Sequence, residues 1–219
     1  RGVDLGTVRH VTLAVAQRLV ECGGKWEQCR VVGVDESAEM LRIARAKDAR
    51  PEWLLGDMRA PPVEGIFDLV ICCYNTVQSL LTDDDLAKFF RSVRSIVGPN
   101  GVFAFDIMQP DLQYLSKPPR DYPARAVTDG TGRRLEDRRD HFYDPRSRIL
   151  AIEHRLIEVG REPAGPLARM RLEYRQYFTA EIDRALAAAG FAVRRRCGDF
   201  DRSDLSAASK KQIFVCFPS

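Results

Sequence analysis

The sequence predicts an α/β fold, a three-layer sandwich around a mostly parallel seven-stranded sheet whose last strand is antiparallel, together with an antiparallel β insertion. Two observations carry this prediction. Between Arg30 and Pro110, short apolar runs alternate with helical patterns, which is typical of a parallel sheet covered on both faces. After Pro110 the helical patterns give way to strand-like segments separated by turns, which is typical of antiparallel strands.

The first predicted elements are the end of a strand at residues 2–5, a turn at residues 6–7 and a helix at residues 8–20. Gly23 and Gly24 follow that helix, and glycine at this place is typical of a left-handed C-terminal stop.

A second strand at residues 30–35 is followed by Ser37, a typical N-cap residue, and by a helical pattern that continues to residue 47. A third short strand, residues 53–56, is followed directly by Asp57. Acidic residues therefore follow two apolar runs at the point where each run ends.

The fourth predicted strand, residues 67–73, precedes Thr82, which is expected to cap a helix at residues 83–97 with an acid three residues further on in a capping box. Residues 99–101, Pro-Asn-Gly, predict a tight turn into a fifth strand at residues 102–106.

Proline-rich residues 111–126 predict an irregular crossing. Three strand-like segments follow, which are expected either to extend the main sheet or to lie over its ligand edge: residues 134–143, 149–159 and 168–178.

The chain then returns to the main sheet. Thr179 is expected to cap a helix at residues 180–189 that stops at Gly190, and strands at residues 191–196 and 212–217 complete the sheet.

The composition favours a globular protein. The chain has 219 residues, of which 45% are hydrophobic and 30% charged, and its formal net charge is +3. No apolar run approaches the roughly 20 residues that span a bilayer, and no basic-then-apolar leader is present, so we expect neither membrane association nor a signal peptide. Acidic residues interrupt the arginine clusters, which favours a solvated strand face over nucleic-acid binding.

The six cysteines and three histidines show no spacing typical of a metal site, so no metal is predicted. We interpret the cysteines as small buried hydrophobic residues in a reducing compartment, which predicts a cytoplasmic protein.

Polar residues at the ends of the predicted strands form a candidate nucleotide site. Asp35 is placed to accept both hydroxyl protons of a ribose, with Glu36 beside it. The alternative for Asp35 is an acid that interacts with the helix dipole. Asp57 could accept the exocyclic amine of adenine, with Met58 packed on the ring, and its alternative is a plain turn aspartate.

With these residues the chain resembles the class I S-adenosylmethionine-dependent methyltransferases of the small-molecule type, which have a Rossmann-like fold. The resemblance covers about residues 2–110. It rests on the following motifs: Asp4-Leu5-Gly6, Asp35, Asp57-Met58, Phe67-Asp68-Leu69-Val70 and Pro99-Asn100-Gly101.

The resemblance implies S-adenosylmethionine as cofactor and methyl transfer to a small molecule at N, O or C. It assigns cofactor binding to these positions: Asp4, Gly6, Thr7, Asp35, Glu36, Asp57, Met58 and Cys73. It also implies a single domain in three parts: a cofactor-binding core at residues 1–110, an insertion or substrate lid at residues 111–178, and a C-terminal part at residues 179–219 that completes the sheet.

Acceptor binding is expected near the ends of the fourth and fifth strands and in the insertion. The candidates are Tyr74, Asn75, Gln109 and Tyr177. The sulfonium is already a strong electrophile, so the protein mainly aligns the nucleophile, and no catalytic base is assigned.

Three alternatives remain open at this point. The first turn, Asp4 to His10, has one glycine where the family has two or three, which leaves room for a non-catalytic binding or regulatory protein. A nicotinamide-dependent oxidoreductase could use Asp35 on the ribose, but the Gly-x-Gly-x-x-Gly fingerprint is absent. A nucleic-acid methyltransferase is disfavoured because no Asn-Pro-Pro-aromatic tetrapeptide follows the fourth strand.

Overall fold

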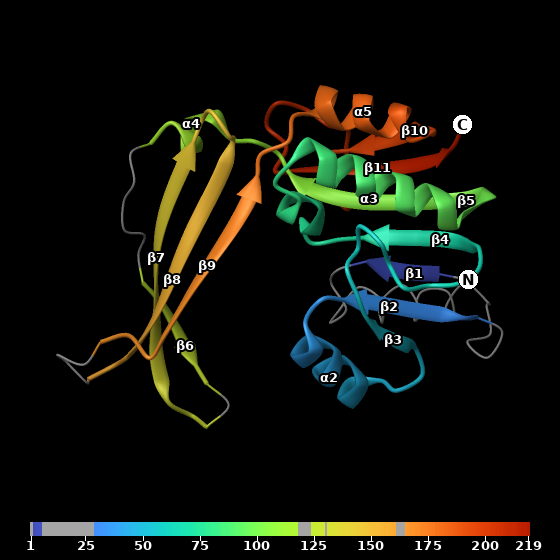
Figure 1. Ribbon diagram of the computed structural model, residues 1–219. Helices are drawn as coiled ribbons and strands as arrows, with labels where there is room; N and C mark the ends of the chain where they lie inside the picture. Colours follow the sequence, from blue (N-terminus) through green and yellow to red (C-terminus); the bar gives the residue numbers. More distant parts are fainter. Residues whose placement is uncertain (1, 6–28, 118–123, 130, 161–164) are drawn as a thin grey trace. The chain divides into compact units, whose positions relative to one another are not determined.

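The computed structural model describes residues 2–5, 29–117, 124–129, 131–160 and 165–219 (Figure 1). The chain divides into two compact units: unit 1 comprises Arg1–Gln109 and Tyr177–Ser219, and unit 2 comprises Pro110–Gln176. The predicted turn at Gly6–Thr7 and the predicted helix at residues 8–20 lie outside the described residues.

Unit 1 is built on a mixed sheet with the strand order β10-β11-β5-β4-β1-β2-β3 (Figure 1). The pairs β1–β2, β2–β3, β1–β4 and β4–β5 are parallel, whereas β11 is antiparallel to both β5 and β10. The strand bounds are β1 Gly2–Leu5, β2 Val31–Asp35, β3 Glu52–Leu55, β4 Phe67–Cys72, β5 Val97–Met108, β10 Phe191–Cys197 and β11 Lys211–Pro218. The predicted α/β fold with parallel strands is thus confirmed.

Helices cover the sheet of unit 1. Helices α3 (Asp83–Ile96) and α5 (Thr179–Ala188) lie side by side, and their buried side chains share one core with Val32 and Val34 of β2. Helix α2 (Ala38–Lys47) instead packs against Trp53, which stands opposite Gly33 in the β2–β3 register. Since neighbouring strand residues point to opposite faces, α2 and α3 lie on opposite faces of the sheet.

The main core is rich in aromatic rings. Phe103 and Phe105 of β5 stack at 5.0 Å between centroids, and Phe105 stacks on Phe214 of β11 at 4.8 Å. Phe89 and Phe90 of α3 pack edge-on against Phe103 at 6.0 Å. These five rings are at most 1% exposed, so they join α3, β5 and β11 into one cluster.

Two of the predicted helix caps are confirmed. The Ser37 hydroxyl accepts a hydrogen bond from the Met40 N–H at 3.3 Å, and the Thr82 hydroxyl accepts one from the Asp85 N–H at 3.1 Å. Each hydroxyl satisfies one of the backbone donors that a helix N-terminus leaves without a partner.

The cap predicted at Thr179 is wrong. Phe178 occupies the N-cap position of α5, and its N–H is bound by the Glu181 carboxylate at 3.0 Å. The Thr179 hydroxyl instead donates to Gln212 Oε1 at 2.8 Å. A tertiary partner on β11 therefore replaces the local capping bond that the sequence suggested.

The turn predicted at residues 99–101 is also wrong, because this segment lies within β5 and the β4–β5 register shifts there. A Cβ atom on Gly101 would stand 2.9 Å from the Phe67 carbonyl oxygen. Glycine is therefore needed here for a close approach between two strands rather than for a free turn.

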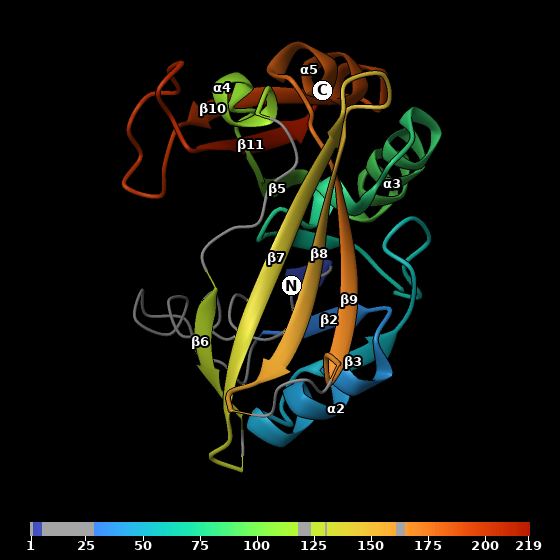
Figure 2. The same cartoon turned by 90° about the vertical axis from the view of Figure 1, so that its left-hand side faces the viewer.

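Unit 2 has a sheet of its own, with the antiparallel order β6-β7-β8-β9 (Figure 2). Its elements are α4 Leu112–Leu115, β6 Arg125–Thr128, β7 Arg134–Asp144, β8 Ile149–Glu158 and β9 Ala168–Arg175. The predicted antiparallel insertion is confirmed, whereas the alternative that these strands extend the main sheet is wrong. The crossing predicted to be irregular contains α4 and the start of β6.

Within the part of the chain that the structure describes, no helix combines the length and the apolar character needed to cross a membrane.

Candidate functional site

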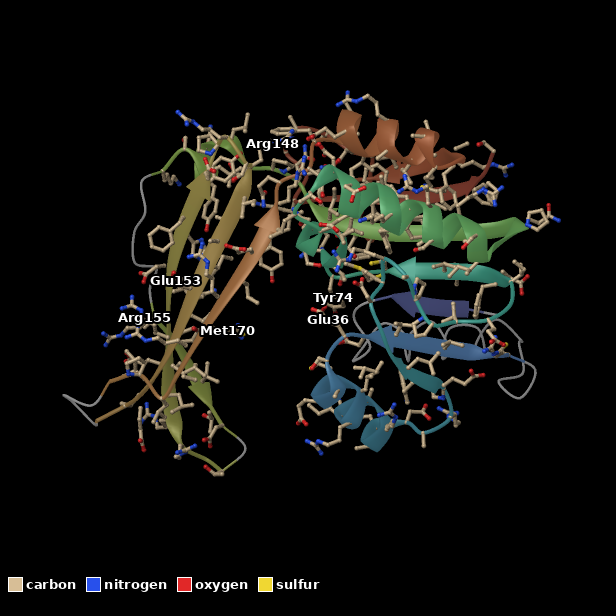
Figure 3. All side chains as sticks on the ribbon, in the orientation of Figure 1. Glu36, Tyr74, Arg148, Glu153, Arg155 and Met170 are labelled. Carbon is tan, nitrogen blue, oxygen red and sulfur yellow. The ribbon has the colours of Figure 1, made fainter. Side chains whose placement is uncertain are left out.

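The candidate site lies where the parallel strands of unit 1 end. Because β1 to β5 are parallel, their carboxyl ends meet at one edge of the sheet, which is where ligands bind in open α/β sheets. Asp35 ends β2, Asp57 follows β3 and Tyr74 follows β4. Figure 3 shows Glu36 and Tyr74 at this same edge. Asp4 belongs to the central strand, paired with Gly33 and Ile71 on its two sides, whereas Gly6 and Thr7 lie outside the described residues.

Asp35 shapes the turn between β2 and α2 and keeps one carboxylate oxygen for another partner. Its Oδ1 accepts the Ser37 N–H at 2.8 Å, and its carbonyl oxygen accepts the Gly56 N–H at 3.1 Å. Oδ2 accepts no hydrogen bond from the described residues. The neighbouring Glu36 is exposed. The carboxylate is thus held in place while one oxygen remains able to accept a ligand hydroxyl.

Asp57 is held by an arginine that the sequence reasoning missed. The Arg59 guanidinium reaches Asp57 Oδ2 at 2.6 Å and Asp85 Oδ1 at 2.6 Å, and the Arg59 N–H donates to Asp57 Oδ1 at 2.8 Å. The side-chain hydrogen bond from Arg59 lowers the pKa of Asp57 below its usual value. This carboxylate is therefore kept ionised and oriented, and its side chain is 43% exposed at the sheet edge. The sequence signal that could have indicated this ion pair was a basic residue two positions after a turn aspartate.

Met58 contacts the protein core, a contact that the sequence did not predict. Its side chain is partly buried against the main core, and its carbonyl oxygen accepts the Ser92 hydroxyl at 3.2 Å. Met58 therefore joins the turn after β3 to α3, and packing on an adenine ring stays a prediction.

The turn after β4 adopts an unusual backbone. Tyr74 and Asn75 have φ values of 60° and 62°, and successive non-glycine residues in the left-handed region are strained. The Cys73 carbonyl oxygen accepts the Thr76 hydroxyl at 2.7 Å, and the Asn75 carbonyl oxygen accepts the Gln78 N–H at 2.8 Å. The Tyr74 side chain is 58% exposed at the sheet edge.

A buried acid holds this turn from β5. Asp106 is 1% exposed, and its Oδ1 accepts the Tyr74 N–H at 2.8 Å while its Oδ2 accepts the Lys211 ammonium at 2.6 Å. The sequence reasoning placed Asp106 at the end of the fifth strand but gave it no role, and it missed Lys211 altogether. The sequence signal that could have indicated a role for Asp106 was an acid at the end of an apolar run, the same signal that identified Asp35.

Two amide oxygens lie near the ends of β4 and β5. Asn75 Oδ1 and Gln109 Oε1 are buried and have no hydrogen-bond partner among the described residues. The backbone of Gln109 is fixed, because its N–H donates to the Lys210 carbonyl oxygen at 3.0 Å. Both oxygens can accept a hydrogen bond from a ligand N–H or O–H group.

The structure removes Tyr177 from the acceptor-binding candidates. This residue is fully buried in the core of unit 1, and its hydroxyl donates to the Leu80 carbonyl oxygen at 2.5 Å. A substrate cannot reach this phenol unless the core opens. The sequence pattern placed Tyr177 in a predicted strand at residues 168–178, but this residue lies beyond the end of β9.

The sheet of unit 2 has two chemically different faces. The register places Met170 opposite His154, so both side chains share a face, while Glu153 and Arg155 lie on the other, as Figure 3 shows. On the second face arginines are paired with acids: Arg155 contacts Asp140 at 2.6 Å and Arg171 contacts Glu153 at 2.9 Å. Arg138, one of the clustered arginines, contacts Glu136 at 3.1 Å on this same face and is 45% exposed, which supports the interpretation of a solvated face for that cluster.

The histidine-bearing face of unit 2 carries two polar pairs. His154 Nδ1 lies 3.0 Å from Asp137 Oδ1, and the His141 ring is hydrogen-bonded to the Tyr114 hydroxyl. Burial lowers the pKa of His141, and the charge of His154 lowers it further. His141 is therefore neutral near pH 7 and can act as a hydrogen-bond partner of the phenol.

We expect unit 2 to lose stability as the pH falls below the ordinary histidine pKa of 6.5. Because the folded-state pKa of His141 is lowered, the unfolded chain binds the proton at a higher pH than the folded chain, so acidification favours unfolding. Thermal melts between about pH 7.5 and about pH 5 should show a smaller fall in Tm for His141→Gln than for the unchanged chain. An equal fall in both would contradict this assignment.

Metal ligands do not gather in the described parts of the chain: no three His, Cys, Asp or Glu side chains there are placed to hold one ion. Among the described cysteines, Cys72, Cys197 and Cys216 are buried, and Cys29 and Cys73 are partly buried. Burial raises the pKa of the Cys216 thiol to about 12, so this thiol is not a nucleophile at neutral pH.

Comparisons with known proteins show which proteins this chain resembles. Residues 10–101 match the family described as "Methyltransferase domain". Over 107 residues the chain is 36% identical to a protein named trans-aconitate 2-methyltransferase from Azoarcus sp., a stretch that covers 46% of this chain and 40% of that protein. The chain thus contains a segment that matches a methyltransferase domain, and it spans less than half the length of the Azoarcus relative.

Solved methyltransferase structures share the fold of the chain. The CcbJ methyltransferase from Streptomyces caelestis has a TM-score of 0.80 at 24% identity, and an S-adenosylmethionine-dependent methyltransferase from Clostridium acetobutylicum has 0.77 at 18%. CalS10 from Micromonospora echinaspora, an amino pentose methyltransferase, has 0.69 at 19%. Each comparison covers 100% of this chain and 83% of the solved chain.

The sheet edge has hydrogen-bond acceptors that suit S-adenosylmethionine, the methyl donor of the proteins that this chain resembles. S-adenosylmethionine presents two ribose hydroxyls and an exocyclic adenine amine, all of which donate hydrogen bonds. Asp35 Oδ2 has no partner among the described residues, and the Asp57 carboxylate is partly exposed and ionised. The available acceptors therefore match the donors of this ligand.

Proposed function

We propose that this chain transfers a methyl group from S-adenosylmethionine to an amine or hydroxyl of a small molecule. The observation that carries the proposal is the acidic edge at the ends of β2 and β3, in a chain with a segment that matches a methyltransferase domain. The two acids follow neighbouring parallel strands, so both can contact one nucleoside.

In this proposal Asp35 binds the ribose hydroxyls, with Glu36 beside it, and Asp57 accepts the adenine amine while Arg59 fixes its orientation. Asp4, Gly6, Thr7 and Cys73 complete the cofactor-binding positions, as the family resemblance assigns them. S-adenosylmethionine supplies an electrophilic methyl group when bound, so the protein has to orient the acceptor in line with that group rather than activate the donor.

The acceptor is proposed to donate hydrogen bonds to Asn75 Oδ1 and Gln109 Oε1. Amide oxygens favour N–H and O–H groups and disfavour carboxylates, so an amino or hydroxyl compound fits these positions better than a tricarboxylate. The name of CalS10, an amino pentose methyltransferase, agrees with such an acceptor, whereas that of the Azoarcus protein, trans-aconitate 2-methyltransferase, refers to a carboxylate. Unit 2 is proposed as the substrate-binding part of the domain.

Methyl-labelled S-adenosylmethionine tests the proposal with two acceptor probes, an amino sugar and trans-aconitate. We expect label in the amino sugar, and Asn75→Ala and Gln109→Ala should each raise its KM about tenfold, which corresponds to one lost hydrogen bond. Binding of S-adenosylhomocysteine, measured by calorimetry, should stay unchanged in both variants.

Asp84→Asn is the matched control, since Asp84 lies on α3 in an exposed ion pair with Lys88. Transfer to trans-aconitate alone would overturn the proposed acceptor class. Failure of both adenosyl ligands to bind would overturn the proposed function itself and favour a non-catalytic protein.

A further inference from the structure

Asp106 stands out among the acids of unit 1 because it is buried away from the proposed cofactor contacts. We propose that Asp106, with its charge balanced by Lys211, is a positioning residue that holds the Cys73–Thr76 turn and so presents Tyr74 and Asn75 to the acceptor. The proposal rests on the proposed function only for the identity of what the turn binds. The contacts of Asp106 with the Tyr74 N–H and with Lys211 lie within unit 1, and they do not depend on what the turn binds.

The turn needs a tertiary restraint. Left-handed backbone costs a non-glycine residue about 1–2 kcal/mol, and Tyr74 and Asn75 adopt it in succession. The bonds from Thr76 to Cys73 and from Gln78 to Asn75 are local, and local bonds of this kind occur in turns of many shapes. The bond from the Tyr74 N–H to Asp106 joins the turn to β5, so it selects one orientation of the turn relative to the sheet.

The position of Asp106 follows from the sheet. Asp106 opposes Ile213 in the β5–β11 register, and Lys211 opposes Met108, so the two charged residues are diagonal neighbours on one pair of strands. The ammonium reaches Asp106 Oδ2 at 2.6 Å and also lies 5.2 Å from the centre of the Phe200 ring. Burial of a carboxylate is strongly unfavourable without such a partner.

The two oxygens of Asp106 have separate tasks, which argues against a role as catalytic base. Oδ1 accepts the Tyr74 amide and Oδ2 accepts the Lys211 ammonium, while the whole residue is 1% exposed. A base must reach the proton it removes within hydrogen-bond distance, and neither oxygen is open to a ligand. Asp106 therefore acts on the acceptor through the backbone of Tyr74.

Three variants test this arrangement: Asp106→Asn keeps the shape and removes the charge, Lys211→Met removes the counter-charge, and the double variant removes both. The main measurement is amide hydrogen exchange at Tyr74. We expect each single variant to speed this exchange about tenfold to hundredfold. Asp106→Asn replaces the charged acceptor of the Tyr74 N–H by a neutral one, and Lys211→Met leaves the Asp106 charge buried without its counter-charge. The double variant should exchange more slowly than either single one, because no unpaired buried charge remains.

A merely structural role predicts a different result. If Asp106 only stabilised the fold, exchange at core amides such as that of Phe103 would rise in parallel with Tyr74, and S-adenosylhomocysteine binding would weaken as well. In Asp106→Asn and in the double variant, neither of which leaves a buried carboxylate without its counter-charge, we expect core exchange and binding of this ligand to remain within about twofold of the unchanged chain, well below the effect of one hydrogen bond. The double Asp84→Asn, Lys88→Met change is the control, since it removes an exposed Lys–Asp pair of similar length, 2.7 Å.

A kinetic measurement uses the amino sugar as methyl acceptor. Each single variant should raise the KM for the amino sugar more than it lowers kcat, with partial rescue in the double variant. Unchanged Tyr74 exchange in both single variants would overturn the positioning role, whether or not any acceptor is methylated. Altered Tyr74 exchange without adenosyl-ligand binding by the unchanged chain would instead count against the proposed function alone, so the two failures are distinguishable.

Discussion

Phe103→Ala is expected to lower the free energy of unfolding of unit 1 by about 3–5 kcal/mol, as for large-to-small replacements in a packed core. Phe103 is fully buried and touches aromatic rings from three different elements, including Phe89 of α3 and Phe191 of β10. Its removal leaves a cavity that these elements cannot close without moving α3 relative to the sheet.

Urea denaturation followed by circular dichroism measures this loss. Phe142→Ala is the matched control: Phe142 is 40% exposed, so its removal should cost less than about 1 kcal/mol. A loss below about 1 kcal/mol for Phe103→Ala would mean that the aromatic cluster repacks to fill the cavity, and would contradict this prediction.

The strands and helices near the sheet edge could be predicted because their signals are local. The apolar run that ends at Asp35 and the hydroxyls of Ser37 and Thr82 specify strand ends and helix starts within a few residues. The Thr179 cap failed for the opposite reason. Its hydroxyl has a partner 33 residues away on β11, and a single sequence contains no local sign of that bond.

The candidate site could be predicted only where one residue carries the signal. Asp35 and Asp57 were found because an acid directly follows an apolar strand. Lys211 was missed because it is 105 residues from Asp106, and only the antiparallel pairing of β11 with β5 brings the two together. Tyr177 was misplaced because the strand-like pattern of residues 168–178 does not show where the strand ends or which unit its last residues belong to.

Asp35→Asn is expected to weaken S-adenosylhomocysteine binding about tenfold to hundredfold without unfolding the chain. Asparagine keeps one oxygen, which can still accept the Ser37 N–H that Asp35 Oδ1 accepts at 2.8 Å. Its second polar group is an amide nitrogen, which donates hydrogen bonds and cannot accept those of ribose hydroxyls. The substitution thus separates the role of Asp35 in the turn from its role toward the ligand.

Calorimetric titration and thermal melts, carried out on the same preparations, distinguish these roles. Asp35→Ala removes both oxygens, so it should lower Tm as well as affinity, whereas Asp35→Asn should lower affinity alone; Asp84→Asn should change neither. Unchanged affinity in Asp35→Asn would assign the ribose contact to the adjacent Glu36, whose exposed carboxylate lies at the same sheet edge. Glu36→Gln would then show the loss of S-adenosylhomocysteine affinity. A fall in Tm of Asp35→Asn equal to that of Asp35→Ala would instead assign this acid to the turn, because the charge itself would then be what fixes the entry into α2.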